Sequence, residues 1–291
     1  TALAFDQWPG VLVNPELLAS FVMPNHPVVN SMIQLASQYL DKWTKDPSLT
    51  GYQYGDPNRV KNMAAAAYAA IQQKNITYAE PPSSFESSGQ RIRLADAVLD
   101  QNLGTCMDMT LLYVACLEQM GLNPVMILMN GHILAGVWLI DDSFSDIITP
   151  DPSQIEKRMS KGIHEMTVVE CTAMCAGNHS SFDEAVAKAE NNVANYGNFA
   201  FAIDVKRARS MGIHPLPIRV KTAEGFKVEH EDRKKKDITG QSKKEVEIFD
   251  LPDSFTKDQL TKRSNWERKL LDLSLRNLIF RIRRKKIRLP S

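Results

Sequence analysis

The sequence has few cysteines and no long apolar run, and each absence excludes a class of protein. Four cysteines in 291 residues are too few and too unevenly spread for a disulfide framework, so we expect reduced thiols and a cytoplasmic location. No run approaches the ~18 apolar residues that a membrane-spanning helix needs. The N-terminus also lacks the basic-then-apolar order of a secretion signal. We therefore expect no membrane partner.

An excess of one charge is also missing. The 35 basic and 34 acidic side chains give a formal net charge of +1, so the chain as a whole has no electrostatic bias toward nucleic acid or anionic lipid. Hydrophobic residues make up 43% of the chain, which is enough for a large core. The chain begins with Thr1 and ends in the basic segment RIRRKKIRLPS, and we expect it to be a piece of a longer polypeptide.

Residues 1–90 are predicted to form a strand and helices that flank the core. TALAFDQWPG is typical of a short strand and turn. Pro27 opens a segment with helical apolar spacing that continues to Trp43. Asp56 stands where the N-cap of an alanine-rich helix beginning at Pro57 is expected.

The segment LGTCMDMTLLYVACLEQMG, residues 103–121, predicts the central helix of a core that spans residues 91–220. Thr105 and Asp108 have the spacing of a capping box, which places Cys106 at the first helical position. Gly121 is the expected stop. Unpaired N–H groups and the helix dipole favour a thiolate there, so Cys106 is a candidate nucleophile. A packed helix cysteine is the alternative.

Asn130-Gly131 joins the apolar runs PVMILM and HILAGVWLI and predicts a tight hairpin whose second strand starts at His132. A histidine at a strand start, just after a glycine, is well placed to face a cleft, so His132 is the candidate base. Among the six histidines, three lie in Pro-rich or charged stretches and are expected at the surface or in loops: His26, His214 and His230. Two are weaker alternatives for the base: His164 and His179.

MTVVECT, residues 166–172, predicts a further strand. If it runs antiparallel beside the His132 strand, its end brings Glu170 toward the imidazole, where a carboxylate would fix the tautomer. A glutamate that ends an apolar strand also needs a partner to offset its desolvation. Glu170 is therefore the candidate orienting acid, and a solvated strand end is the alternative.

At these residues the sequence resembles the transglutaminase-like superfamily of papain-type thiol enzymes. The matching motifs are LGTCMDMTLLYVACLEQMGLNPVMI, NGHILAGVWL and VVECT. The resemblance implies an α+β, papain-like fold with the central helix packed on an antiparallel sheet. It also implies a cysteine protease or amidase that uses no cofactor, cleaves a peptide or amide substrate, and carries Cys106, His132 and Glu170 as its triad.

The sequence departs from the family pattern at two positions. The family commonly has aspartate where this chain has Glu170, and often an aromatic residue where it has Ile133. Gln101 stands where papain-like enzymes carry the glutamine that stabilises the oxyanion, although a polar loop residue is the alternative. The alternative function is a catalytically inactive binding or scaffold module.

The remaining segments carry three further expectations. Ser181 and Glu184 predict a second capping box for the helix of residues 182–192, and FAIDV predicts another strand. Cys171, Cys175 and His179 have a spacing that suggests zinc, but no fourth ligand is evident and we expect no metal.

The C-terminal part is charged. Residues 221–263 are expected to be a linker or a solvated excursion. WERKLLDLSLRNLIF, in residues 264–291, resembles the opening helix of a domain found in large bacterial helicase-like proteins of superfamily one, here truncated. The chain has no Walker-type phosphate loop, so no helicase activity is expected in it. Its basic end would suit nucleic-acid contacts, with a truncated helix end as the alternative.

Overall fold

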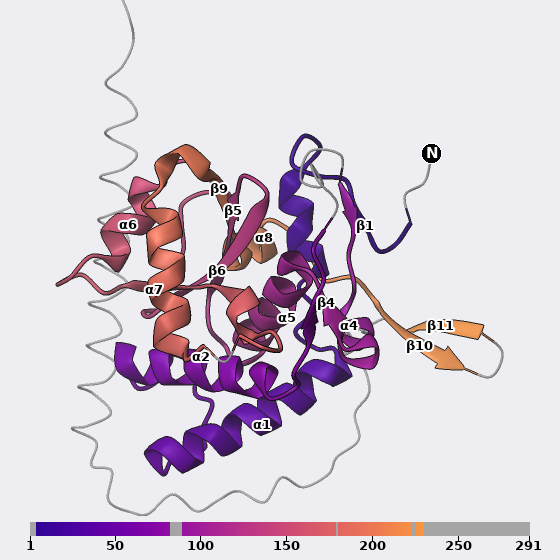
Figure 1. Cartoon of the computed structure of the whole chain (residues 1–291), viewed down its shortest axis with the longest axis horizontal. Helices are drawn as coiled ribbons and strands as arrows, with labels where there is room; N and C mark the ends of the chain where they lie inside the picture. The colour runs from indigo at the N-terminus through magenta and orange to yellow at the C-terminus, as the bar shows by residue number, and fades with distance from the viewer. Residues whose placement is uncertain (1–3, 82–88, 179, 223–224, 230–291) are drawn as a thin grey trace, which may run out of the picture. The chain divides into compact units, whose positions relative to one another are not determined.

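A five-stranded antiparallel sheet forms the centre of the protein, whose computed structural model describes residues 4–81, 89–178, 180–222 and 225–229 (Figure 1). Its strands, in spatial order, are β7 (Ile148–Thr149), β9 (Phe199–Asp204), β5 (Pro124–Met129), β6 (His132–Trp138) and β8 (Met166–Val169). Each neighbouring pair runs antiparallel. The chain is thus a mixed α and β fold with an antiparallel sheet, as expected.

Both faces of the sheet are buried, which explains why β5 reads as a continuous apolar run. Met126 and Leu128 belong to the larger core cluster, whereas Val125 and Ile127 belong to a second cluster on the opposite face. The helix α5 (Cys106–Gln119) packs against β5 and β6 on the first face. On the other side, α6 (Ser153–Met159) and α7 (Phe182–Val193) pack against β8 (Figure 1).

The two long N-terminal helices flank the core, as the sequence predicts. They are α1 (Pro27–Thr44) and α2 (Pro57–Gln72), and both pack against each other and against α5. The Asp56 carboxylate accepts a hydrogen bond from the Asn58 N–H at 2.9 Å, which confirms the predicted N-cap.

Two short strand pairs bring distant segments to the start of α5. The strand β1 (Gln7–Trp8) pairs with β3 (Gln90–Arg91), and β2 (Thr77–Tyr78) runs parallel to β4 (Leu103–Gly104). The remaining short helices are η1 (Pro15–Phe21), α4 (Ala95–Gln101), η2 (Cys171–Met174), η3 (Tyr196–Asn198) and α8 (Val205–Ser210). The β1–β3 pair joins the first residues of the chain to those that lead into the central helix.

The Arg209 guanidinium links three segments of the chain through hydrogen bonds and an ion pair. It forms an ion pair with Glu118 near the end of α5, with N–O distances of 2.8 and 2.9 Å. It also donates to the carbonyl oxygens of Ala19 and Val22, at 3.0 and 2.8 Å, and to that of Ile213 at 2.9 Å. The largely buried Arg209 side chain therefore supplies hydrogen-bond donors to all of these oxygen atoms.

The start of the charged segment, predicted to be a linker or a solvated excursion, is a hairpin. Residues on either side of position 221 pair as an antiparallel hairpin of β10 (Ile218–Thr222) and β11 (Gly225–Glu229). Alternating Ile218 and Val220 give this stretch the period of a strand despite its charge. Residues 230–263 and the helicase-like segment of residues 264–291 lie outside the described part. Among the described residues, no helix has the length and apolar character needed to cross a membrane.

Candidate active site

Cys106 is the first residue of α5, and the predicted capping box is present. Thr105 N–H donates to the Asp108 carboxylate at 3.0 Å, and Asp108 N–H donates to the Thr105 hydroxyl at 3.2 Å. The helix ends as predicted, since Gly121 takes a left-handed φ of 74°. At the first helical position the Cys106 N–H has no acceptor within the helix, so it is available to an incoming group.

The hairpin and the next strand bring His132 and Glu170 together. His132 opens β6 opposite Met129, and Ala135 in the same strand pairs with Val169, the residue before Glu170. The His132 Nε2 and Glu170 Oε2 atoms lie 2.7 Å apart. The His132 side chain is 28% exposed, whereas Glu170 is buried. Both side chains therefore meet at the edge of the sheet where the sequence places them.

The Cys106 thiol lies close enough to the His132 imidazole to help raise its pKa. Since Nε2 faces Glu170, Nδ1 is the ring nitrogen left for the sulfur. Burial by itself lowers the pKa of His132, but its interactions with the neighbouring Cys106 thiol and Glu170 carboxylate outweigh burial and raise this pKa to about 10. The imidazole is thus held in its protonated form at neutral pH.

Two residues that sequence reasoning missed hold the Glu170 carboxylate. Its Oε1 accepts from the Thr172 N–H at 3.0 Å and from the Thr172 hydroxyl at 2.7 Å, and its Oε2 accepts from the Asn192 amide at 3.4 Å. Burial raises the pKa of Glu170. The hydrogen bond with His132, the positive charge of His132 and the hydrogen bonds from Thr172 outweigh burial, so this pKa lies below its usual value. Glu170 is therefore a carboxylate opposite an imidazolium.

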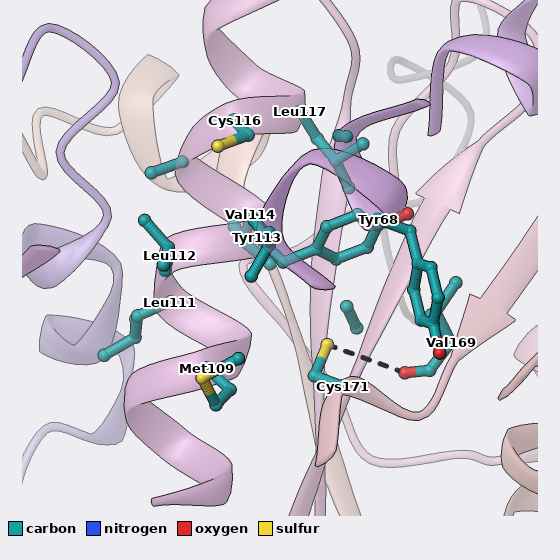
Figure 2. Close-up of a cluster of buried hydrophobic side chains, with 14 of the residues drawn as sticks. Tyr68, Met109, Leu111, Leu112, Tyr113, Val114, Cys116, Leu117, Val169 and Cys171 are labelled. Atoms are coloured by element: carbon teal, nitrogen blue, oxygen red, sulfur yellow. Dashed lines mark hydrogen bonds between the residues drawn. The ribbon is translucent and has the colours of Figure 1, made fainter. Parts of the chain in front are cut away.

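The other three cysteines lie in surroundings that disfavour a thiolate. Burial raises the pKa of Cys116 to about 12 and that of Cys175 to about 11, and it raises the pKa of Cys171 further still. Figure 2 shows Cys116 and Cys171 among apolar side chains, with the Cys171 thiol directed at the Val169 carbonyl oxygen, 3.8 Å away. Cys171 was expected in a strand, but it begins η2 because Glu170 ends the strand and caps that turn.

The zinc pattern does not lie on one face of a regular helix. Cys171 begins the short 3-10 helix η2 and Cys175 follows its end, while His179 lies outside the described residues. Within the described ranges, no group of three or more His, Cys, Asp or Glu side chains is arranged to hold a metal ion.

Gln101 lies at the end of α4, exposed to solvent, and lines a cleft of about 720 Å³ together with Thr105. In the part of the chain that the structure describes, its amide makes no hydrogen bond. Asn102 next to it adopts a left-handed φ of 51°, which turns the chain back into β4. Gln101 is therefore near the start of α5 but not held against Cys106.

His26 lies in the loop that leads into α1, which is one of its two expected settings, but it is buried and not at the surface. Its Nδ1 accepts a hydrogen bond from the Val28 N–H at 3.3 Å and so caps α1, and its Nε2 lies 3.9 Å from Asp96. Burial lowers the pKa of His26 more than Asp96 raises it. His164 and His214 are exposed, and His179 and His230 lie outside the described residues.

The immediate surroundings of Cys106 are enclosed, since the residue exposes only 1% of its surface. Tyr78, on the strand beside Gly104, was missed by sequence reasoning. Burial, and then the negative charge of Cys106, raise the pKa of Tyr78 to about 12, so its phenol lies within electrostatic range of the thiol. The sequence around Tyr78 does not indicate that this residue lies near Cys106. Its position depends on the parallel pairing of β2 with β4, which lies 26 residues further along the chain.

Comparison with known proteins assigns no family and no function to this chain. No family model, no curated protein and no solved structure matches this chain. The functional conclusion therefore depends on the residues and their geometry.

Proposed function

We propose that this protein is a thiol hydrolase that cleaves an amide or peptide bond through Cys106, His132 and Glu170, on a papain-like fold of the transglutaminase-like type. The observation that supports it most is the position of the His132 imidazole, which lies 2.7 Å from the Glu170 carboxylate and close enough to the Cys106 thiol for both groups to raise its pKa. A nucleophile, a base and an orienting acid in this order form the arrangement that nucleophilic catalysis requires.

The reaction follows from the charges of the three groups. With the proton held on His132, the Cys106 sulfur attacks the carbonyl carbon as a thiolate, and a C–S bond forms. The imidazolium then gives its proton to the leaving nitrogen as the C–N bond breaks. Water attacks the thioester, its proton passes to His132, and the C–S bond breaks to release the acid. Glu170 stabilises the imidazolium before the first proton transfer and after the second, and it holds the neutral ring in place between them.

Hydrogen-bond donors near the start of α5 would stabilise the oxyanion. The unpaired Cys106 N–H lies at the positive end of the helix dipole, where negative charge develops. Gln101, across the cleft wall that it shares with Thr105, is the second candidate donor and would have to turn toward the bound carbonyl oxygen.

The burial of Cys106 favours a second candidate, a binding or scaffold module without catalysis. A thiol with 1% exposure is closed to a substrate until a neighbouring side chain moves. The two functions differ in one measurable property, the accessibility and nucleophilicity of the sulfur at neutral pH.

Alkylation with iodoacetamide at pH 7, read by peptide mass spectrometry, tests the hydrolase. Cys106 is expected to react much faster than Cys116, which serves as the internal control because its pKa is raised by burial. His132→Gln should slow alkylation of Cys106 and leave Cys116 unchanged. Equal and slow labelling of both cysteines in the wild type would support the scaffold.

A further inference from the structure

Thr172 holds one oxygen of the Glu170 carboxylate with two hydrogen bonds. Oε1 accepts from the Thr172 N–H at 3.0 Å and from the Thr172 hydroxyl at 2.7 Å. The other oxygen, Oε2, lies 2.7 Å from the Nε2 atom of His132. Because both Thr172 donors bind the same oxygen, they fix the direction of the carboxylate and leave Oε2 for the imidazole.

A glutamate needs such an anchor more than an aspartate does. Its side chain has one more rotatable bond, so a carboxylate that is not fixed can point in more directions. The structure also offers space for this movement, since Glu170 lines a polar pocket of about 400 Å³. Asn178, Lys188 and Asn191 line the same pocket, and their amides and ammonium group would give a displaced carboxylate other hydrogen-bond donors. Burial alone therefore does not keep Glu170 beside His132.

The backbone on both sides of the Glu170–Thr172 contact is fixed by other hydrogen bonds. Thr172 lies in the 3-10 helix η2, which Glu170 caps. The Thr172 carbonyl oxygen accepts from the Cys175 N–H at 3.0 Å and from the Asn178 amide at 3.2 Å. The Glu170 N–H donates to the carbonyl oxygen of Ala185 in α7 at 3.2 Å. The hydroxyl of Thr172 is thus presented to the carboxylate from a rigid turn.

Thr172 is the main anchor of the carboxylate. An ionised carboxylate only accepts hydrogen bonds, so the Thr172 hydroxyl donates its proton to Oε1. Within the described ranges this hydroxyl has no second hydrogen-bond partner. Asn192, the other side chain that donates to Glu170, lies 3.4 Å from Oε2 and makes a weaker bond, on the oxygen that faces His132.

We propose that Thr172 is a positioning residue that keeps the Glu170 carboxylate aligned with the His132 imidazole. This inference rests on the proposed hydrolase, because it assigns Thr172 a role in the same site. Thr172 acts through Glu170: while Oε1 is held, Oε2 faces the ring and stabilises its charged form. Loss of the hydroxyl should weaken this alignment although no charged group is removed.

An NMR titration of the His132 ring in the full chain tests the proposal. Thr172→Val exchanges the hydroxyl for a methyl group and keeps the N–H. We expect the pKa of His132 to fall by about one unit, which corresponds to one lost hydrogen bond to a charged group. Thr172→Ser, which restores the hydroxyl, should return this pKa to the wild-type value. Thr167→Val, the same exchange at a buried position of β8, should leave it unchanged.

The direction of the change separates positioning from a purely electrostatic effect. If Thr172 only withdrew negative charge from a carboxylate that stays in place, its removal would raise the pKa of His132. A rise or an unchanged value in Thr172→Val would therefore overturn the proposal, and so would a failure of Thr172→Ser to restore the pKa. If Thr172→Val does not fold, Thr172→Ala removes the same hydroxyl and carries the same expectation.

Alkylation of Cys106 distinguishes this proposal from the hydrolase itself. The titration reports on the pair of His132 and Glu170 whether or not the thiol is a nucleophile. If Cys106 reacts no faster than Cys116 while the Thr172 variants change the pKa as expected, Thr172 still positions Glu170 and only the hydrolase is rejected. If Cys106 reacts fast while Thr172→Val leaves the pKa of His132 unchanged, the hydrolase is supported and Thr172 has no positioning role.

Discussion

The imidazole Nε2 of His132 lies 2.7 Å from the Oε2 of Glu170, although 38 positions separate the two residues. The hairpin places His132 at the start of β6, and the antiparallel partner β8 ends one residue before Glu170. The pair is therefore fixed by strand register, and each partner holds the other in its charged form.

Glu170→Gln should lower the pKa of His132 from about 10 toward its usual value of 6.5. The variant removes the negative charge and leaves burial, which by itself lowers this pKa. An NMR titration of the His132 ring measures the change directly. Glu190→Gln, at an exposed position of α7, is the matched control. An unchanged midpoint for His132 in Glu170→Gln would show that the carboxylate does not hold the proton.

The free energy of unfolding should decrease between pH 7 and pH 10 because of His132. The pKa of His132 is raised in the folded protein, so the folded protein binds this proton more tightly than the unfolded chain does. The resulting stabilisation is complete below about pH 6.5 and is lost as the pH rises toward 10. His132→Gln should show a smaller decrease over this range in urea unfolding. A decrease as large as that of the wild type would assign it to other groups.

His26 should act in the opposite direction at acidic pH. Burial lowers the pKa of His26, so the unfolded chain binds the proton more readily and stability falls as the pH drops below about 6.5. His26→Asn keeps an N-cap acceptor but does not titrate there. We expect the variant to lose less stability than the wild type between pH 7 and pH 5, whereas His164→Asn, at an exposed position, should behave as the wild type. Identical pH profiles for His26→Asn and the wild type would contradict this.

The two capping boxes offer a matched pair of substitutions. Thr105→Ala and Ser181→Ala should each destabilise the protein by about 1 kcal/mol, because each leaves a helix N–H unpaired. Only Thr105→Ala should change the alkylation rate of Cys106, since Thr105 caps the helix that begins with the thiol and Ser181 caps another helix. Equal effects of both variants on that rate would indicate that global stability, and not the local helix end, governs it.

Local features of the sequence were sufficient to predict the elements that carry the site. The capping box of Thr105, the hairpin turn before His132 and the strand that precedes Glu170 each depend on a few neighbouring residues. His132 and Glu170 could be expected to lie close together because the start of one antiparallel strand lies beside the end of its neighbour.

The missed features depend on contacts between distant segments. The burial of His26 is decided by packing of α1 and α4 and not by the prolines around it. The two-residue strand that positions Tyr78 is too short to show a period of two, so no sequence pattern marks it. Thr172 and Asn192 reach Glu170 only after η2 and α7 have folded.

The bonds of Arg209 join parts of the chain that lie far apart in the sequence. One guanidinium joins Ala19 near the beginning, Glu118 in α5 and Ile213 just after α8. A protein trimmed inside either boundary would retain an ionised side chain with part of its acceptors missing, and such losses are strongly destabilising. The amino-terminal third is therefore integral to the core, and cutting the chain between these segments should yield no folded fragment.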